Sequence, residues 1–556
     1  MKRPLFAALL VAAFVFQSTA YGQAVTVKIT AAERKAAEAV TAKQISDYLY
    51  FVASDEMEGR DTPSRGLDTT AKFIGMNLSK WGFKPAGDNG TYYQKIALHR
   101  DSVDPASTSV EVGGKKFSYG DDIVRVSGNS TAPISAPVVF AGNGWLIKSK
   151  DLDPYRGIDV KGKIVAVYSE GAASGRNLVA LPAGVTQADL TGTRGTDWAD
   201  ATTYARSHGA AGVIVLPSKF LADNWSMLSQ NFGRSRVTVE KFAQPAQPGP
   251  QGGNAMPVFI VSPKLTSDLF AGEQGDPLKG ASNSFDLSAG KTFSFKLGSK
   301  PETLWTQNVV AIWEGSDPVL KNEMVAIGAH YDHVGIVNNP NATDKINNGA
   351  DDDGSGTVAV LSIAEALAKS TVKPKRSILF VWHCGEEKGL WGSQYFNRFP
   401  TVNIKNVVAQ LNIDMIGRSK KAGDTDPLDK ELSGENEIYV IGKDMMSSTL
   451  GSVVDNVNKG YLNLTYDTRY DDPKDPNRFF FRSDHFNYAQ NGIPIAFWFD
   501  GVHVDYHRPG DEPQKIDYAK MEKVTRTIML TLFELADLKT RPKVDKQLPP
   551  ELTRTN

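Results

Sequence analysis

The fold is decided by the stretch MVAIGAHYDH at residues 324–333, in which an apolar run of strand length ends in polar residues. Further apolar runs of this kind lie at Val309–Trp313, Ser377–Trp382, Val407–Ile413, Ile438–Ile441 and Ile493–Phe499. Helical patterns occur around them, at residues 66–81, 358–367 and 521–535. Continuous apolar strands that alternate with helices predict an α/β fold with a mainly parallel central sheet flanked by helices.

A second module is indicated between residues 101 and 296, where short β-type runs are separated by segments rich in Gly, Pro, Ser and Asn. The runs are Val138–Phe140, Ile164–Tyr168, Val213–Leu216 and Val258–Val261. A chain of 556 residues also exceeds what one core usually supports. We therefore expect a β-rich insert at 101–296 within an α/β domain made of residues 23–100 and 297–540, followed by a tail at 541–556.

The N-terminus predicts export. Lys2 and Arg3 precede an apolar run from Leu5 to Phe16, and small residues follow up to Gly22, which is typical of a signal peptide over residues 1–22. We expect a periplasmic or secreted protein without stable membrane insertion, because no later segment has the roughly 20 apolar residues of a membrane helix. A net charge of -1, from 62 basic and 63 acidic residues, argues against nucleic acid as a partner. The oligomeric state is not indicated.

Polar residues cluster at the ends of the apolar runs. His330 and Asp332 follow the first, the pair Glu386-Glu387 follows Ser377–Trp382, and Asp414 follows Val407–Ile413. In a parallel sheet these ends meet at one edge, where ligands bind. Imidazole and carboxylate are the ligands of catalytic zinc, and shared carboxylates suit two adjacent ions.

Each signal also has an ordinary structural explanation. A single His-x-Asp is usually a hydrogen-bonded surface pair, the acidic run Asp351–Asp353 is ordinarily a helix N-cap, and adjacent glutamates often form a solvated face. The coincidence of several such signals at one sheet edge favours a metal site. We expect four other residues near these runs to be structural: His333, His383, Cys384 and His485.

These residues resemble the M28 family of metallopeptidases. The segment DEMEGR at 55–60 is similar to the family's N-terminal part, and 308–537 is similar to its catalytic core. The stretches IDVKGKIV at 158–165 and AAGVI at 210–214 resemble the protease-associated domain that many members carry as an insert.

The resemblance implies roles for eight residues. His330 and Asp414 would bind one zinc ion, Glu387 and His507 the other, and Asp352 would bridge them, because the family's bridging aspartate stands three residues before a Ser-Gly pair, here Ser355-Gly356. Glu386 would be the general base and Tyr506 an oxyanion donor, while Asp332 would orient His330.

The implied activity is that of a secreted zinc-dependent exopeptidase. We expect an aminopeptidase that cleaves the N-terminal bonds of peptides or proteins with a hydroxide bridging two Zn²⁺ ions. Dipeptidases and carboxypeptidases share this metal shell. A glutaminyl cyclase, which uses one zinc ion, and a receptor-like ectodomain that has lost its ligands are the alternatives from other classes.

Overall fold

The computed structural model describes residues 25–128, 132–170, 178–233, 235, 237–242, 256–280, 283–339 and 341–553. The signal peptide expected at 1–22 lies outside the described residues. The chain divides into two compact units, one formed by residues 1–96 and 306–556 and the other by residues 97–305. The first unit is the α/β part, and each unit is described by itself below.

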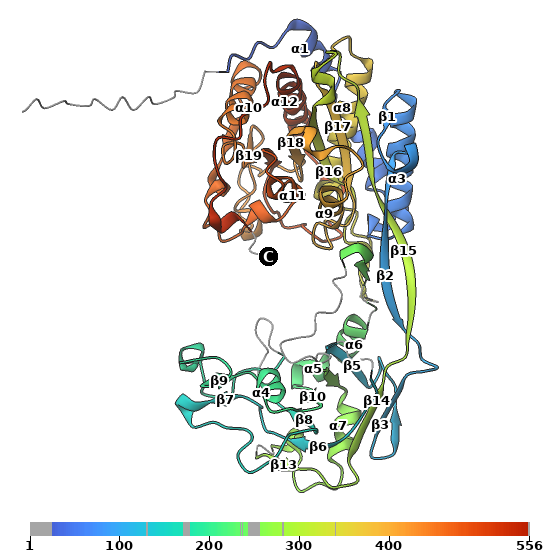
Figure 1. Ribbon diagram of the computed structural model, residues 1–556, viewed down its shortest axis with the longest axis vertical. Helices are drawn as coiled ribbons and strands as arrows, with labels where there is room; N and C mark the ends of the chain where they lie inside the picture. The colour runs from blue at the N-terminus through green and yellow to red at the C-terminus, as the bar shows by residue number, and fades with distance from the viewer. Residues whose placement is uncertain are drawn as a thin grey trace, which may run out of the picture. The chain divides into compact units, whose positions relative to one another are not determined.

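The first unit is built on a mixed sheet whose central strands are parallel (Figure 1). The strand order is β2 (Tyr93–Val103), β15 (Ser299–Trp313), β17 (Ser377–His383), β16 (Met324–His330), β18 (Val407–Ile413), β21 (Ile495–Phe499), β19 (Glu437–Ile441) and β20 (Thr465–Asp467). The four strands β17, β16, β18 and β21 run parallel, whereas β15 and β19 pair antiparallel on either side of them. The carboxyl ends of the four parallel strands therefore meet at one edge.

Helices cover both faces of this sheet. Side chains of successive strand residues point to opposite faces of a sheet. On one face, Nε1 of Trp382 donates a hydrogen bond to the Thr357 carbonyl in α8 (Gly356–Lys369) at 3.1 Å. Its neighbour Val381 belongs to a core cluster with Phe396 of α9 (Trp391–Arg398) and Tyr488 of α11 (His485–Gln490). The remaining helices are α1 (Ala31–Glu38), α2 (Ala42–Val52), α3 (Arg65–Lys80), α10 (Ser448–Gly460) and α12 (Tyr518–Asp537).

The second unit contains the four predicted β-type runs, as β6 (Ile134–Phe140), β8 (Ile164–Val167), β10 (Gly212–Val215) and β12 (Val258–Val261). These four strands are parallel neighbours, an arrangement that requires crossover connections. Those connections include helices that the sequence did not predict. They are α4 (Ala201–Ser207), α5 (Lys219–Asp223) and α6 (Trp225–Gly233). A further unpredicted helix, α7 (Pro263–Phe270), follows β12.

No helix in the described part of the chain is both long and apolar enough to cross a membrane.

Candidate metal centre

The carboxyl edge of the parallel strands gathers five predicted ligands. His330 is the last residue of β16, Glu387 follows β17, and Asp414 follows β18 directly. Asp352 lies in the irregular turn that precedes α8, and His507 lies in the loop after β21. All but His507 are largely buried, and the His507 side chain keeps 35% of its surface exposed.

The five side chains form two groups that share Asp352. Nε2 of His330 lies 3.3 Å from Oδ1 of Asp352 and 3.5 Å from Oδ1 of Asp414. Nε2 of His507 lies 3.1 Å from the other oxygen of Asp352, Oδ2, and 3.0 Å from Oε2 of Glu387. We call these sets the first ligand group (His330, Asp414 and Asp352 Oδ1) and the second ligand group (His507, Glu387 and Asp352 Oδ2).

These separations fit ligands around zinc. With Zn–N and Zn–O bonds of about 2.0–2.2 Å, neighbouring ligand atoms of a tetrahedron stand roughly 3.3–3.6 Å apart. Asp352 Oδ2 is buried and accepts no hydrogen bond from the described residues, as expected for an atom left free to bind a cation. The donor set and its spacing therefore suit a pair of zinc ions.

The charge balance of the two groups also suits cations. Burial opposes ionisation of Asp352, but the neighbouring imidazoles of His330 and His507 outweigh it and hold the pKa of Asp352 well below its ordinary value. Burial lowers the pKa of His507, and Asp352 and Glu387 more than compensate, so that it rises to about 10. Burial raises the pKa of Asp414. Several carboxylates packed together in a buried site need positive charge nearby to stay ionised.

Glu386 lines the same pocket as His330, Asp352 and Asp414 but belongs to neither ligand group. Burial, together with the charges of Glu387 and Asp414, raises its pKa well above the ordinary value, although His330 opposes this shift. A carboxylate with a raised pKa beside metal ligands is suited to accept and return a proton.

Asp332 holds the backbone around Glu386. Its Oδ1 accepts a hydrogen bond from the Glu386 amide at 3.1 Å, and its Oδ2 accepts one from Oγ1 of Thr62 at 3.1 Å. Nδ1 of His330 lies 3.1 Å from the Asp332 carbonyl oxygen and 3.7 Å from the carboxylate. Nδ1 of His330 is thus closer to the backbone carbonyl of Asp332 than to its carboxylate.

Tyr506 lines the pocket beside the ligands, and its ring stacks on that of His507 with centroids 3.9 Å apart. Its hydroxyl oxygen accepts a hydrogen bond from Arg482 at 3.2 Å, which leaves the hydroxyl proton free for another acceptor. Arg482 also lines the pocket, and the rest of the pocket wall is apolar. It consists of Met415, Phe479, Phe497, Phe499 and Val502.

His333, which we expected to be structural, lies against the second ligand group. Its Nδ1 lies 3.0 Å from Oε1 of Glu387, the oxygen that faces away from His507, while its buried Nε2 has no hydrogen-bond partner among the described residues. Two sets of three side chains lie close enough together to hold a metal ion. One set is His333, Asp352 and Glu387, and the other is His330, Asp353 and Asp414. The only sequence signal for His333 was its place three residues after His330.

The other residues expected to be structural are buried in packing positions. Burial lowers the pKa of His383 and of His485 to about 3, and the His485 ring stacks on Phe497 at 4.5 Å. Burial raises the pKa of the Cys384 thiol, so this thiol stays protonated and unreactive.

Arg60 links three segments near the site through hydrogen bonds. Its guanidinium is fully buried and donates to backbone carbonyls only: Val52 and Asn348 at 2.7 Å each, Gly349 at 2.8 Å and Tyr331 at 3.0 Å. These acceptors lie at the end of α2, beside His330 and before Asp352. Arg60 therefore links the N-terminal part of the unit to the segments that carry His330 and Asp352.

Replacing Arg60 by Met is expected to lower the free energy of unfolding of the first unit by about 3 kcal/mol or more, because four buried carbonyls lose their donor. Denaturant unfolding measures the change. Arg65→Met, at an exposed position on the first turn of α3, is the matched control and should change stability by about 0.5 kcal/mol or less. Equal stability of the two variants would contradict the role of Arg60.

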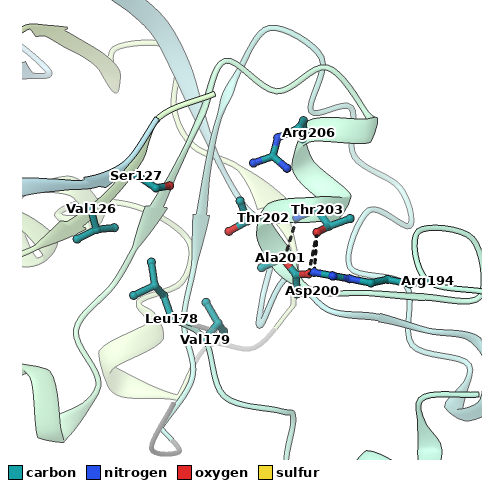
Figure 2. A pocket seen from close by; sticks show the side chains of 10 residues that line it. All are labelled: Val126, Ser127, Leu178, Val179, Arg194, Asp200, Ala201, Thr202, Thr203 and Arg206. Atoms are coloured by element: carbon teal, nitrogen blue, oxygen red, sulfur yellow. Dashed lines mark hydrogen bonds and ion pairs between the residues drawn. The ribbon is translucent and has the colours of Figure 1, made fainter. Parts of the chain in front are cut away.

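The second unit contains a cavity of about 330 Å³ (Figure 2). Figure 2 shows Arg194 reaching Asp200 at the start of α4, and the two side chains form an ion pair at 2.7 Å. Thr203 also donates to this carboxylate. The described residues that line the cavity include no His, Cys or Glu, and their one Asp is already paired.

The fold and the paired ligand groups describe an α/β domain that gathers potential metal ligands at the carboxyl edge of its sheet. Residues 308–532 match the model of peptidase family M28. The matched part of the chain holds all five predicted ligands.

Curated relatives carry names of the same kind. Leucine aminopeptidase 2 of Trichophyton rubrum is 27% identical over 274 residues, which are 44% of this chain and 49% of the relative. Leupeptin-inactivating enzyme 1 of Streptomyces exfoliatus is 29% identical over 209 residues, 37% of this chain and 38% of the relative. The chain thus spans half or less of the length of these two relatives.

A solved structure shares the fold. The aminopeptidase from Aneurinibacillus sp. strain AM-1 superposes with a TM-score of 0.50 over 92% of this chain and 98% of its own, at 17% sequence identity.

Proposed function

We propose that the protein is a zinc-dependent aminopeptidase with two metal positions. The observation that carries the proposal is the placement of Asp352, which directs one carboxylate oxygen to each ligand group. A single carboxylate shared in this way is typical of two-metal hydrolases. The M28 match and the names of the curated relatives support a peptidase that acts on N-termini.

The proposed ligands are those of the two groups. His330 and Asp414 would hold one ion, Glu387 and His507 the other, and Asp352 both. When bound, the zinc ions lower the pKa of a water molecule and polarise the scissile carbonyl.

Three residues of the chain would act on the substrate or its surroundings. The Glu386 carboxylate takes a proton from the attacking water and delivers it to the nitrogen of the leaving amine. The Tyr506 hydroxyl, whose oxygen already accepts a hydrogen bond from Arg482, donates to the oxygen that gains negative charge. Asp332 holds the Glu386 backbone in place.

A panel of peptide substrates tests the proposal. Because the pocket wall beside the ligands is apolar, leucyl substrates should be cleaved roughly 100-fold faster, in kcat/KM, than glycyl substrates. N-acetyl-leucyl peptides should be inert, and chelator should abolish activity until zinc is restored. Cleavage of blocked peptides alone would exclude an aminopeptidase, and conversion of N-terminal glutamine to pyroglutamate would support the cyclase instead.

Two further predictions accompany the proposed function. Export as a periplasmic or secreted enzyme is supported by the residues of the N-terminal segment, and a mature chain that begins after Ala20 or Gly22 would verify it. The assignment of residues 101–296 to a protease-associated domain stays a prediction.

A further inference from the structure

We infer that Asp351 and Asp353, the two aspartates that flank Asp352, are positioning residues, and that each organises a different ligand group. The inference rests on the proposed pair of metal positions. It concerns how the ligands are held, since neither flanking side chain is assigned to a metal.

Asp353 supports the first ligand group. Its buried carboxylate accepts three hydrogen bonds, all from backbone amides: Oδ2 from His330 at 3.2 Å, and Oδ1 from Met415 at 3.2 Å and Gly356 at 2.8 Å. His330 is itself a ligand of this group, and Met415 follows the ligand Asp414. Both oxygens of Asp353 are thus occupied, which distinguishes it from Asp352 and argues against its acting as a ligand.

Asp351 supports the loop that carries His507. Its Oδ2 lies 3.3 Å from Nε2 of His503, which belongs to that loop. Its Oδ1 accepts a hydrogen bond at 2.6 Å from the amide of Gly417, which lies three residues after Asp414 of the first ligand group. Nδ1 of His503 accepts a hydrogen bond from the Asp505 amide, so in the neutral ring the proton sits on Nε2, facing Asp351.

Asp511 holds the C-terminal end of the loop that carries His507. Its Oδ2 accepts hydrogen bonds from the amides of Asp351 at 3.0 Å and Asp352 at 3.1 Å, and its carbonyl oxygen accepts one from Ala350 at 3.0 Å. His507 lies between His503 and Asp511. Two of the three segments in the second ligand group are therefore joined through contacts that do not include Asp353.

The two supports have a thermodynamic consequence. Buried carboxylates that accept backbone amides fix a loop before a ligand binds, so less ordering remains to be done on binding. Loss of such a support typically lowers metal affinity about 10–100-fold. Asp353 accepts the amides of His330 and of Met415, which follows Asp414, whereas His503, which faces Asp351, lies in the loop that carries His507. Removing Asp353 should therefore weaken one metal position, and removing His503 should weaken the other.

Zinc titration of the full-length, metal-free protein by calorimetry tests this inference. His330→Ala and His507→Ala identify the two binding steps by abolishing one each. Asp353→Asn should then weaken the step lost in His330→Ala by about 10–100-fold, and His503→Phe should do the same to the step lost in His507→Ala. In each variant the other step should stay within about threefold. Asp344→Asn, at an exposed loop position, is the matched control and should alter neither step.

Equal weakening of both steps in each variant, or no weakening in either, would overturn the inference. Should Asp353→Asn not fold, as judged by circular dichroism, His503→Phe decides alone and must weaken only the step lost in His507→Ala. Failure of the proposed function is recognised separately, because the unaltered protein would then bind no zinc or would lose no step in the His330 and His507 variants.

Discussion

Replacing Glu386 by Gln is expected to lower kcat for a leucyl substrate by about 10²–10⁴-fold while the zinc content of the protein stays unchanged. Glutamine keeps the size of the side chain but cannot take a proton from the attacking water. Glu386 lies outside both ligand groups, and its backbone amide donates to Asp332 whatever the side chain is. Steady-state kinetics and elemental analysis of the same preparation measure the two quantities.

Two further variants serve as comparisons for Glu386→Gln. Glu387→Gln alters the neighbouring ligand and should lower zinc content as well as activity, whereas Glu435→Gln, at an exposed position, should change neither. Near-normal kcat in Glu386→Gln would remove the proton-transfer role, and loss of zinc from it would move Glu386 into the ligand set.

Replacing Asp352 by Ala is expected to strip zinc from both positions and to lower kcat/KM by at least about 10³-fold. The shared carboxylate is the only described side chain that supplies an oxygen to both ligand groups, so its loss leaves each group one ligand short. The variant should also lose the stabilisation that zinc confers on the unaltered protein, which is about 2.7 kcal/mol when free zinc is 100 times its dissociation constant.

Thermal unfolding with and without added zinc measures this loss, and Asp344→Ala in the same loop region serves as the control with an exposed aspartate. Retention of two zinc ions by Asp352→Ala would exclude a bridging role. Loss of one ion only would assign Asp352 to a single ligand group.

The central strands of the first unit were predictable because they are buried along their whole length. Every residue of β16, β17 and β18 is buried, so each strand appears in the sequence as a mainly apolar run, interrupted in β18 by Gln410 and Asn412. The helices of the second unit escaped prediction because they are short, from the five residues of α5 to the nine of α6. Helices of this length are stabilised by tertiary packing and leave a weak sequence pattern.

The gathering of His330, Glu387 and Asp414 at one edge was also predictable, since the carboxyl ends of parallel strands lie side by side. The support from Arg60 was not. All its acceptors are backbone carbonyls, which every residue type supplies, and they come together only when separate segments have folded.

The sequence by itself determined the class of fold and the edge of the sheet at which imidazole and carboxylate groups collect. Only the tertiary structure decided what each member of Asp351–Asp353 does. Three consecutive carboxylates look alike in sequence, and the family resemblance alone favoured Asp352. The backbone leaves helical geometry at Asp352 and Asp353, with φ and ψ of −95° and 104° and of −113° and 49°. These angles turn Asp352 toward both ligand groups, while Asp353 and Asp351 turn toward the amides of neighbouring loops.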